Sequence, residues 1–465
     1  MKNRLPLWIT LTLATSLTAA EFHVAPNGTD INPGTAEQPF ATLERARDAL
    51  REFKAANGGT LKEPVKVILH RGEYVFSRTF ELTPQDSGTK NAPVCYLAAK
   101  DETPVITSAR SITGWKKHDE HIWVAAVPKG WRFHNLYVNG APQQVARTPN
   151  TDVKGCRSWP RAQGNAPLTP EGMRVTVPAG LLKALPDNGD VEVKCDAKGN
   201  RVEQTTPPLA TAGASAFDQR VRYVEFRGLT FEGTDRLPED QWPKDWLKRN
   251  AENPDGALFL QGVEACTITD CKFRNCGAYG VVLDHYAQRV SVLGNEMISL
   301  GSGGVQATGY GPGTLDVNGH HVIRRNYVHG TGRDYMHSAA VTIFGSGHND
   351  IALNWIADCP YAAVQICGAN HTALNNPDHP MQGPSSDLHG DRAAQFQMRS
   401  HELPPPNGRN DPADYEEVKP FLHSGGNWIA RNVGANQNPA TGAQKNPATW
   451  KESFSSFQGV VLWPG

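Results

Sequence analysis

The sequence predicts an all-β fold, namely a right-handed parallel β-helix (solenoid) with an N-terminal capping helix and loop-rich insertions. One observation is a repeat, because the segment from Cys266 to Leu283 realigns on the segment from Val290 to Ala307, 24 residues later. Another is an asparagine that recurs at one place in successive copies. A short repeat cannot bury its apolar face alone, so such copies stack into a continuous core.

The recurring turn position holds Cys271 in one copy and asparagine in the later ones. These are Asn295, Asn326, Asn354 and Asn432. Asparagine tolerates the left-handed helical conformation, and its amide can bond the coils on either side, so we expect Asn295, Asn326 and Asn354 to form a ladder. The apolar residues three positions earlier should stack inside the helix: Val292, Ile323 and Ile351. A glycine and a second apolar strand follow each turn, which gives at least two strands per coil.

The N-terminal part begins with features of export and of a capped solenoid. Residues 1–20 join a basic start to an apolar run and small residues, which is typical of a signal peptide cleaved after Ala20. We therefore expect a secreted or periplasmic protein without membrane association. A first strand near Phe22 precedes a helix that Thr42 can N-cap and that ends before Asn57. This helix should cover the apolar interior of the first coil.

The chain divides into three predicted parts after the signal peptide. Residues 21–220 form an N-terminal β-helix segment with the cap helix and a loop-rich insertion, and residues 221–435 form the core coils. Residues 436–465 are expected to be an irregular or truncated C-terminal end, because the apolar run 459–465 has no capping helix after it. A truncated solenoid of this kind would be weakly active or inactive.

Composition excludes several classes of function. Lys plus Arg (46) nearly balances Asp plus Glu (47), so the chain lacks the basic character of a nucleic-acid-binding protein. Eight cysteines are sparse for an exported chain of this length, and we expect at most one or two disulfides. The sequence has no zinc-finger spacing, phosphate-binding glycine loop, nucleophile elbow or His-Glu-x-x-His motif. We expect a monomer that needs no cofactor.

The chain resembles glycoside hydrolase family 141 and related secreted β-helix hydrolases. The resemblance is carried by residues 23–40, by residues 228–235 and by the repeats down to Cys367. It implies a hydrolase that acts on a plant or algal polysaccharide through paired carboxylates. One departure concerns the coils after Asp358, where family members bring an acidic residue into a Gly-Gly-aromatic strand. This chain has a proline-rich excursion there, so part of the family's catalytic equipment is expected to be missing.

Glycosidic hydrolysis requires a carboxylic acid and a carboxylate, and stacked coils can bring such a pair together. Asp284 follows an apolar strand, and the alternative is an ordinary turn aspartate. Asp334 and His337 lie in a loop that has five more residues than the same part of the preceding coil. Loops on a rigid scaffold often carry functional residues. His329 and Asp358 occupy adjacent places in successive coils and can meet across the stack, either in a site or on a solvated face.

Four further residues are candidates for sugar binding. His285 and Tyr286 flank Asp284, and Trp242 and Trp246 lie in the insertion 236–255. Indole rings stack on the apolar faces of sugars, although tryptophan is also a routine packing residue. Two alternatives to a hydrolase stay open. A polysaccharide lyase would use the Asp387–Arg392 loop, with Ca²⁺ on its oxygen ligands, and a non-catalytic solenoid would only bind carbohydrate.

Overall fold

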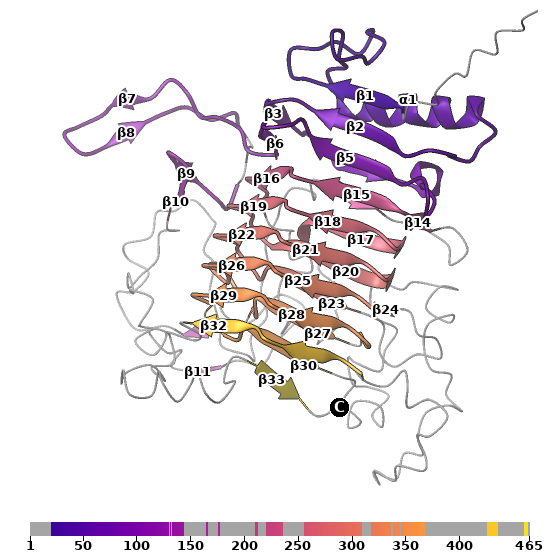
Figure 1. The fold of residues 1–465 in the computed structure, drawn as a ribbon. Helices are drawn as coiled ribbons and strands as arrows, with labels where there is room; N and C mark the ends of the chain where they lie inside the picture. Colours follow the sequence, from indigo (N-terminus) through magenta and orange to yellow (C-terminus); the bar gives the residue numbers. More distant parts are fainter. Residues whose placement is uncertain are drawn as a thin grey trace, which may run out of the picture.

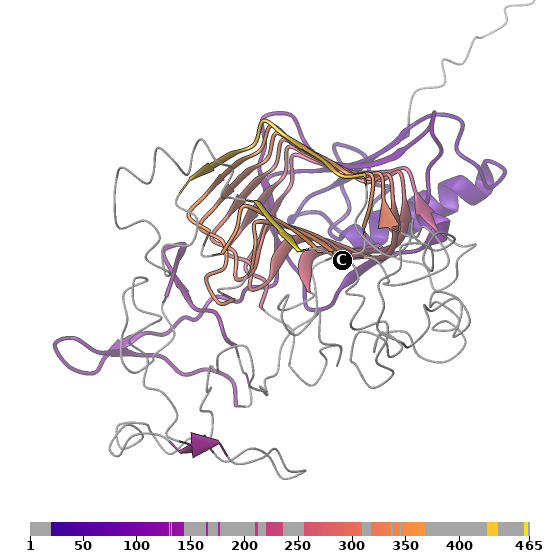
Figure 2. The same ribbon diagram turned by 90° about the horizontal axis from the view of Figure 1, so that it is seen from below.

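The computed structural model describes residues 20–129, 131, 133–143, 220–235, 255–308, 318–335, 338–344, 346–359, 361–367 and 426–435, and the short strands at 164–165, 175–176, 210–212 and 460–463. They form a right-handed parallel β-helix, as the sequence predicts (Figure 1). Each coil passes through sheet A, then sheet B, then sheet C. Seen along the stack, successive coils superimpose (Figure 2).

Each sheet takes one strand from nearly every coil, paired in parallel with the coil before and after. Sheet A is β1 (Glu21–Val24), β2 (Val65–Leu69), β5 (Val94–Ala98), β15 (Val224–Arg227), β18 (Thr267–Thr269), β21 (Ser291–Leu293), β25 (Val322–Arg324), β28 (Asp350–Ala352) and β31 (Trp428–Ala430). Sheet B is β3 (Gly72–Val75), β6 (Pro104–Thr107), β16 (Thr230–Glu232), β19 (Lys272–Arg274), β22 (Glu296–Ile298), β26 (Tyr327–His329), β29 (Trp355–Ala357) and β32 (Val433–Ala435).

Sheet C includes the longest strands of the described residues. Its main path is β4 (Phe80–Leu82), β13 (Ala210–Ala212), β17 (Gly256–Glu264), β20 (Tyr279–Gln288), β23 (Val305–Thr308), β27 (Val341–Phe344), β30 (Val364–Cys367) and β33 (Val460–Trp463), with β14 (Val221–Arg222) and β24 (Asn318–Gly319) beside it. Short antiparallel pairs lie outside the three sheets: β7 (Lys116–Lys117) with β8 (Trp123–Val124), β9 (Tyr137–Val138) with β10 (Ala141–Pro142), and β11 (Gly164–Asn165) with β12 (Val175–Thr176).

The interior is a stack of aliphatic side chains, as predicted. Val292 pairs with Ile323, and Ile323 with Ile351, and all three are fully buried. Sheet C contributes a second column in Val281, Val305, Val341 and Val364. Because identical positions stack from coil to coil, each coil shields the apolar face of its neighbour, and the hydrophobic effect stabilises the array rather than any single coil.

The predicted asparagine ladder is confirmed, with one correction to its geometry. Asn295 donates its backbone N–H and its Nδ2 to Asn326 Oδ1, both at 3.0 Å. Asn326 donates in the same way to Asn354 Oδ1, at 3.0 and 2.9 Å. The left-handed residue of each turn, however, comes one position before the asparagine. These residues are Asp270, Gly294, Arg325, Leu353 and Arg431. Asparagine is therefore selected for its amide and not for its backbone conformation.

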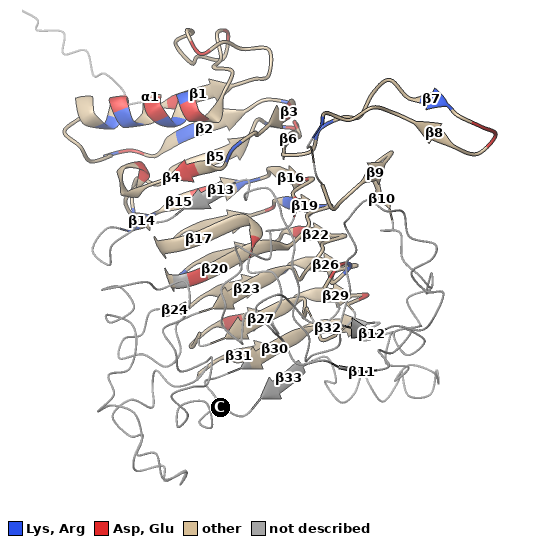
Figure 3. Cartoon of the chain, turned by 180° about the vertical axis from the view of Figure 1, so that it is seen from behind, with Lys and Arg blue, Asp and Glu red and all other residues tan. Residues whose placement is uncertain are grey.

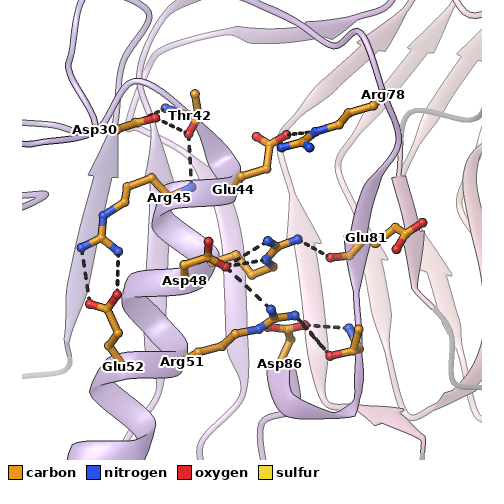
Figure 4. Close-up of polar contacts among 12 residues, drawn as sticks. Asp30, Thr42, Glu44, Arg45, Asp48, Arg51, Glu52, Arg78, Glu81 and Asp86 are labelled. Atoms are coloured by element: carbon orange, nitrogen blue, oxygen red, sulfur yellow. Dashed lines mark hydrogen bonds and ion pairs between the residues drawn. The ribbon is translucent and has the colours of Figure 1, made fainter.

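The helix α1 (Leu43–Ala56) covers the first coil, as predicted. Thr42 Oγ1 accepts a hydrogen bond from the Arg45 N–H, which is a standard N-cap. The buried face of α1 joins the core through Leu43, Ala46 and Leu50. The outer face carries charges (Figure 3), and Figure 4 shows Arg51 reaching the fully buried carboxylate of Asp86 at 2.7 Å beside the short helix η1 (Pro84–Asp86). This ion pair fixes the helix to the sheets beneath it.

The solenoid continues without a break across the predicted boundary at residue 220, because β5 pairs directly with β15. At the other end, Val460–Trp463 adds a strand in register with Val364–Cys367. Among the described residues, five cysteines are free thiols: Cys95, Cys266, Cys271, Cys276 and Cys359. In the part of the chain that the structure describes, helices fall short of the length and apolar character needed to cross a membrane.

Candidate functional site

The turns between sheets B and C differ from coil to coil, and acidic residues gather in them. Each A–B turn from β15 to β32 has two residues, whereas the B–C turns span 233–255, 275–278, 299–304, 330–340 and 358–363. Asp235 and Asp255 stand at the two ends of the first of these turns, and Asp334 lies in the fourth. We call His134, Asn135, Asp235, Asp255, Arg333 and Asp334 the B–C turn cluster.

Asp235 is held by the segment that precedes β9. Its Oδ2 accepts from the His134 backbone N–H at 3.1 Å and lies 3.2 Å from His134 Nδ1. Its Oδ1 accepts from Asn135 Nδ2 at 3.2 Å. The side chain is only 10% exposed. Hydrogen bonds to both oxygens fix the plane of this carboxylate.

Arg333 connects Asn135 to a second carboxylate. Its Nη2 donates to Asn135 Oδ1 at 3.2 Å and to Asp334 Oδ2 at 3.1 Å, while Nη1 donates to the Ser299 carbonyl at 3.2 Å. A chain of hydrogen bonds therefore runs from Asp235 through Asn135 and Arg333 to Asp334. Burial lowers the pKa of Arg333, but Asp334 and Tyr137 raise it by more, so the net shift is upward and the guanidinium stays charged.

Asp334 sits close to the turn of the preceding coil. The Asp334 N–H donates to the Gly301 carbonyl at 3.0 Å. A Cβ on Gly301 would lie 2.0 Å from the Gly277 carbonyl oxygen and 2.8 Å from Asp334 Oδ2. A side chain at residue 301 would therefore displace both the turn backbone and the carboxylate, so glycine at this position allows the approach.

Asp255 is a neutral acid at pH 7. It is 3% exposed, and burial raises its pKa to about 8, with the nearby charge of Asp235 adding to the rise and the Gly256 N–H opposing it. A carboxyl group that keeps its proton at neutral pH can donate it, and Asp334 is held by the Arg333 guanidinium. The cluster thus combines a protonated carboxyl with carboxylates held by donors.

The β9–β10 segment is anchored to the solenoid by its own contacts. Tyr137 donates its hydroxyl to the Asn275 carbonyl at 2.6 Å, and Asn275 Nδ2 donates to the Gly140 carbonyl at 3.0 Å. Arg333 lies over the Tyr137 ring, 5.8 Å from its centroid. Burial raises the pKa of Tyr137, so the phenol remains a hydrogen-bond donor. These contacts hold the segment that contains His134 and Asn135 against the solenoid.

Polar side chains are also buried on sheet C near these turns. Gln306 and Thr342 are each 1% exposed and pair in register, and the Tyr279 hydroxyl lies 3.3 Å from Thr342 Oγ1. The side-chain oxygens of Gln306 (Oε1) and Ser302 have no hydrogen-bond partner within the described part of the chain. Buried polar groups are rarely left unmatched, so a polar ligand is one way to satisfy these two.

The structure revises two of the predicted site residues. Asp284 does not end its strand, because β20 continues to Gln288 and pairs Asp284 with Gln261 and Thr308. The carboxylate is thus 4% exposed within sheet C and not in a turn. Tyr286 lies under the Arg220 guanidinium, 4.0 Å from the ring centroid, so a cation already covers one face of the ring.

The structure brings His329 and Asp358 together, with His329 Nε2 2.7 Å from Asp358 Oδ2. Both side chains are about 40% exposed, and Asp358 begins the B–C turn of its coil. The remaining predicted residues lie outside the described ones: His337, Trp242, Trp246, the side chain of His285 and the Asp387–Arg392 loop. No group of three or more His, Cys, Asp or Glu side chains suited to a metal ion occurs among the described residues.

Sequence reasoning missed most of the B–C turn cluster. His134 and Asn135 lie 101 and 100 residues before Asp235, and Asn135 lies 198 residues before Arg333. The repeat places Asp334 but carries no information on a segment outside the repeat. The available signal was the position of Asp235 and Asp255 at the two ends of an insertion between a sheet B strand and a sheet C strand.

Comparison with known proteins supports the fold. The family model described as a right handed beta helix region matches residues 255–377. A solved structure titled as a glycoside hydrolase covers 95% of this chain and 100% of its own, with a TM-score of 0.57 and 16% sequence identity. A complex of XylC with xylose is 12% identical, with 74% and 61% coverage and a TM-score of 0.41. No curated protein matches the sequence.

Proposed function

We propose that this protein is a glycoside hydrolase that cleaves a polysaccharide at the B–C turn cluster. The observation that carries the proposal is the hydrogen-bonded chain from Asp235 through Asn135 and Arg333 to Asp334, next to the protonated Asp255. Two carboxyl groups in opposite protonation states are what glycosidic hydrolysis requires. The likeness in fold to a structure titled as a glycoside hydrolase agrees with this assignment.

In this proposal Asp255 is the general acid, and it protonates the leaving glycosidic oxygen. Asp334 is the carboxylate that acts as nucleophile or as base toward water. Arg333 donates to Asp334 and is itself held by Asn135, which fixes the orientation of the Asp334 carboxylate. Asp235 raises the pKa of Asp255 and so helps to retain its proton. Ser302 and Gln306 supply hydrogen-bonding groups for sugar hydroxyls.

Membership of glycoside hydrolase family 141, a plant or algal polysaccharide as substrate, and secretion or periplasmic location belong to the same proposal. They are supported by the N-terminal segment 1–20, by the family resemblance and by the nearly neutral net charge of the chain. The proposal requires no cofactor. We also propose that the protein is a monomer.

The test is to incubate the protein with a panel of plant and algal polysaccharides and to analyse the products. We expect new reducing ends without ultraviolet absorbance, and we expect Asp334→Asn to lower their rate of appearance by roughly a thousandfold or more. Asp48→Asn, the same chemical change on the outer face of α1 and outside the cluster, is the matched control. Products with an unsaturated end, lost on addition of a calcium chelator, would instead establish the lyase. Binding without any new ends would establish the non-catalytic solenoid.

A further inference from the structure

The outward face of sheet B carries a row of rings, one exposed and two half-buried, that lies outside the B–C turn cluster. One column of this face takes one residue from each of five successive strands: Lys272, Glu296, Tyr327, Trp355 and Val433. The column changes from charged to apolar at β26. Trp355 is 57% exposed and Val433 is 50% exposed. Contiguous apolar side chains in solvent mark interaction sites more often than single ones do.

The rings of this row have a defined arrangement. The Tyr327 and Trp355 rings meet edge to face, with centroids 5.3 Å apart and planes at 78°. The Tyr327 and His329 rings are nearly parallel, with centroids 5.9 Å apart and planes at 6°. His329 in turn contacts Asp358. Apolar ring surface and a hydrogen-bonding pair thus occur on one face of the sheet. We call Tyr327, His329 and Trp355 the sheet B aromatic row.

We propose that the sheet B aromatic row binds a neutral glycan chain as a second contact surface, separate from the B–C turn cluster. Sugar rings present apolar faces that stack on aromatic side chains, and their hydroxyls can donate to the Asp358 carboxylate and hydrogen-bond with the His329 ring. The choice of a glycan as the ligand rests on the proposed function. The evidence that this face is a binding surface is the exposure and the geometry of its rings, and it does not depend on the proposed function.

The width and charge of the row favour such a chain over other partners. Lys272 and Glu296 bound the apolar column, and the three apolar positions span about 10 Å at the coil spacing of a β-sheet. A stable protein interface needs roughly 800 Å² on each partner, which is far wider than this row. The charged residues beside the row have both signs, with Lys272 and Arg325 basic and Glu296 and Asp358 acidic, so they do not select an anionic chain.

The row is also continuous with the proposed catalytic site. His329 ends β26, and the turn that follows it carries Arg333 and Asp334. A glycan that lies along the row is therefore held next to the B–C turn cluster. Such a contact raises the local concentration of a polymer without touching the bond that is cleaved.

Trp355→Ala tests the proposal, and Trp428→Ala is its control. Trp428 is 53% exposed, but it lies on sheet A, and the Arg324 guanidinium lies 5.6 Å from its ring centroid. Migration of each variant is measured in native gels that contain xylan, mixed-linkage β-glucan, galactan or homogalacturonan. We expect at least one neutral glycan to retard the wild-type protein, with the apparent affinity falling at least tenfold in Trp355→Ala, partly in Trp355→Phe and not in Trp428→Ala.

Each opposite result would overturn the proposal. These results are absence of retardation by every neutral glycan, equal retardation of Trp355→Ala and the wild type, equal loss in both tryptophan variants, or retardation by homogalacturonan alone. Self-association of the wild type that Trp355→Ala abolishes in sedimentation would identify a second copy as the partner. Asp334→Asn separates the two proposals, because we expect it to bind as the wild type does whether or not the wild type hydrolyses the glycan.

Discussion

The A–B turns and the B–C turns of the same coils obey different constraints. In each A–B turn from β15 to β32, a left-handed residue is followed by the ladder position, and the turn has two residues. The B–C turns also begin with a left-handed residue, for example Ser299, Gly330 or Asp358, but they then vary in length. Packing fixes the first set, because one extra residue would break the ladder. The second set is free to vary, and it is there that acidic and basic groups collect.

The largest effect is expected when one asparagine of the ladder in the A–B turns is removed. Asn326→Ala leaves Asn295 without its acceptor, and it leaves Asn354 Oδ1 and the Val292 carbonyl without the Nδ2 donor, all in the interior. Each unmatched buried group costs about 1–3 kcal/mol, so we expect a loss of roughly 3–5 kcal/mol in the free energy of unfolding. Denaturant titration measures this loss. A change below about 1 kcal/mol would show that the ladder is not what holds the A–B turns.

A change in the B–C turn should have the opposite profile. Arg333→Gln removes the donor to Asp334 and to Asn135 while keeping a polar side chain. We expect turnover of the glycan to fall roughly 10- to 100-fold, since Asp334 loses its orientation and part of its charge stabilisation. Unchanged kcat together with a lower melting temperature would make Arg333 a structural residue only.

The protonated carboxyl gives a prediction for pH dependence. The folded pKa of Asp255 is about 8, above the usual value near 3.9, so the folded protein holds one more proton than the unfolded chain between these pH values. Stability therefore falls as pH rises through this window, on the order of 1 kcal/mol per pH unit. Asp255→Asn should lack that slope, so the free energy of unfolding of the variant should rise relative to that of the wild type between pH 5 and 8. Parallel curves for the two proteins would contradict the neutral state of Asp255.

The smallest effect is expected at the start of the ladder. Cys271 occupies the ladder position. Its backbone N–H donates to Asn295 Oδ1 at 2.9 Å, and its Sγ–H donates to the Phe226 carbonyl at 3.5 Å. An asparagine amide at this position can donate to the same carbonyl, as Asn295 does to Ile268. Cys271→Asn should therefore change the free energy of unfolding by less than about 1 kcal/mol, as measured by denaturant titration. Cys271→Val, which cannot donate, is the comparison.

The sequence predicted those features that repetition determines. The period around Asn295 and Asn326 was enough to place the ladder, the interior column and the strands on either side of each A–B turn. It predicted the encounter of His329 and Asp358 for the same reason, since neighbouring positions of adjacent coils meet. The contacts of Asp235 with His134 and Asn135 follow no repeat. They depend on where a long non-repeating segment packs, and local spacing does not determine that.

The asparagine ladder also has an electrical consequence. In each of the four links between Cys271 and Asn432 the donor lies on the N-terminal coil and the acceptor is the side-chain oxygen of the next coil. Each asparagine Nδ2 also donates to a backbone carbonyl of the preceding coil. The side-chain amide dipoles are thus aligned along the axis of the solenoid, with their oxygens toward the helix-capped end. Aligned hydrogen bonds polarise one another, as peptide groups do in an α-helix. The ladder is therefore a polar filament within an apolar core, and its positive end lies at the coil that contains Asn432.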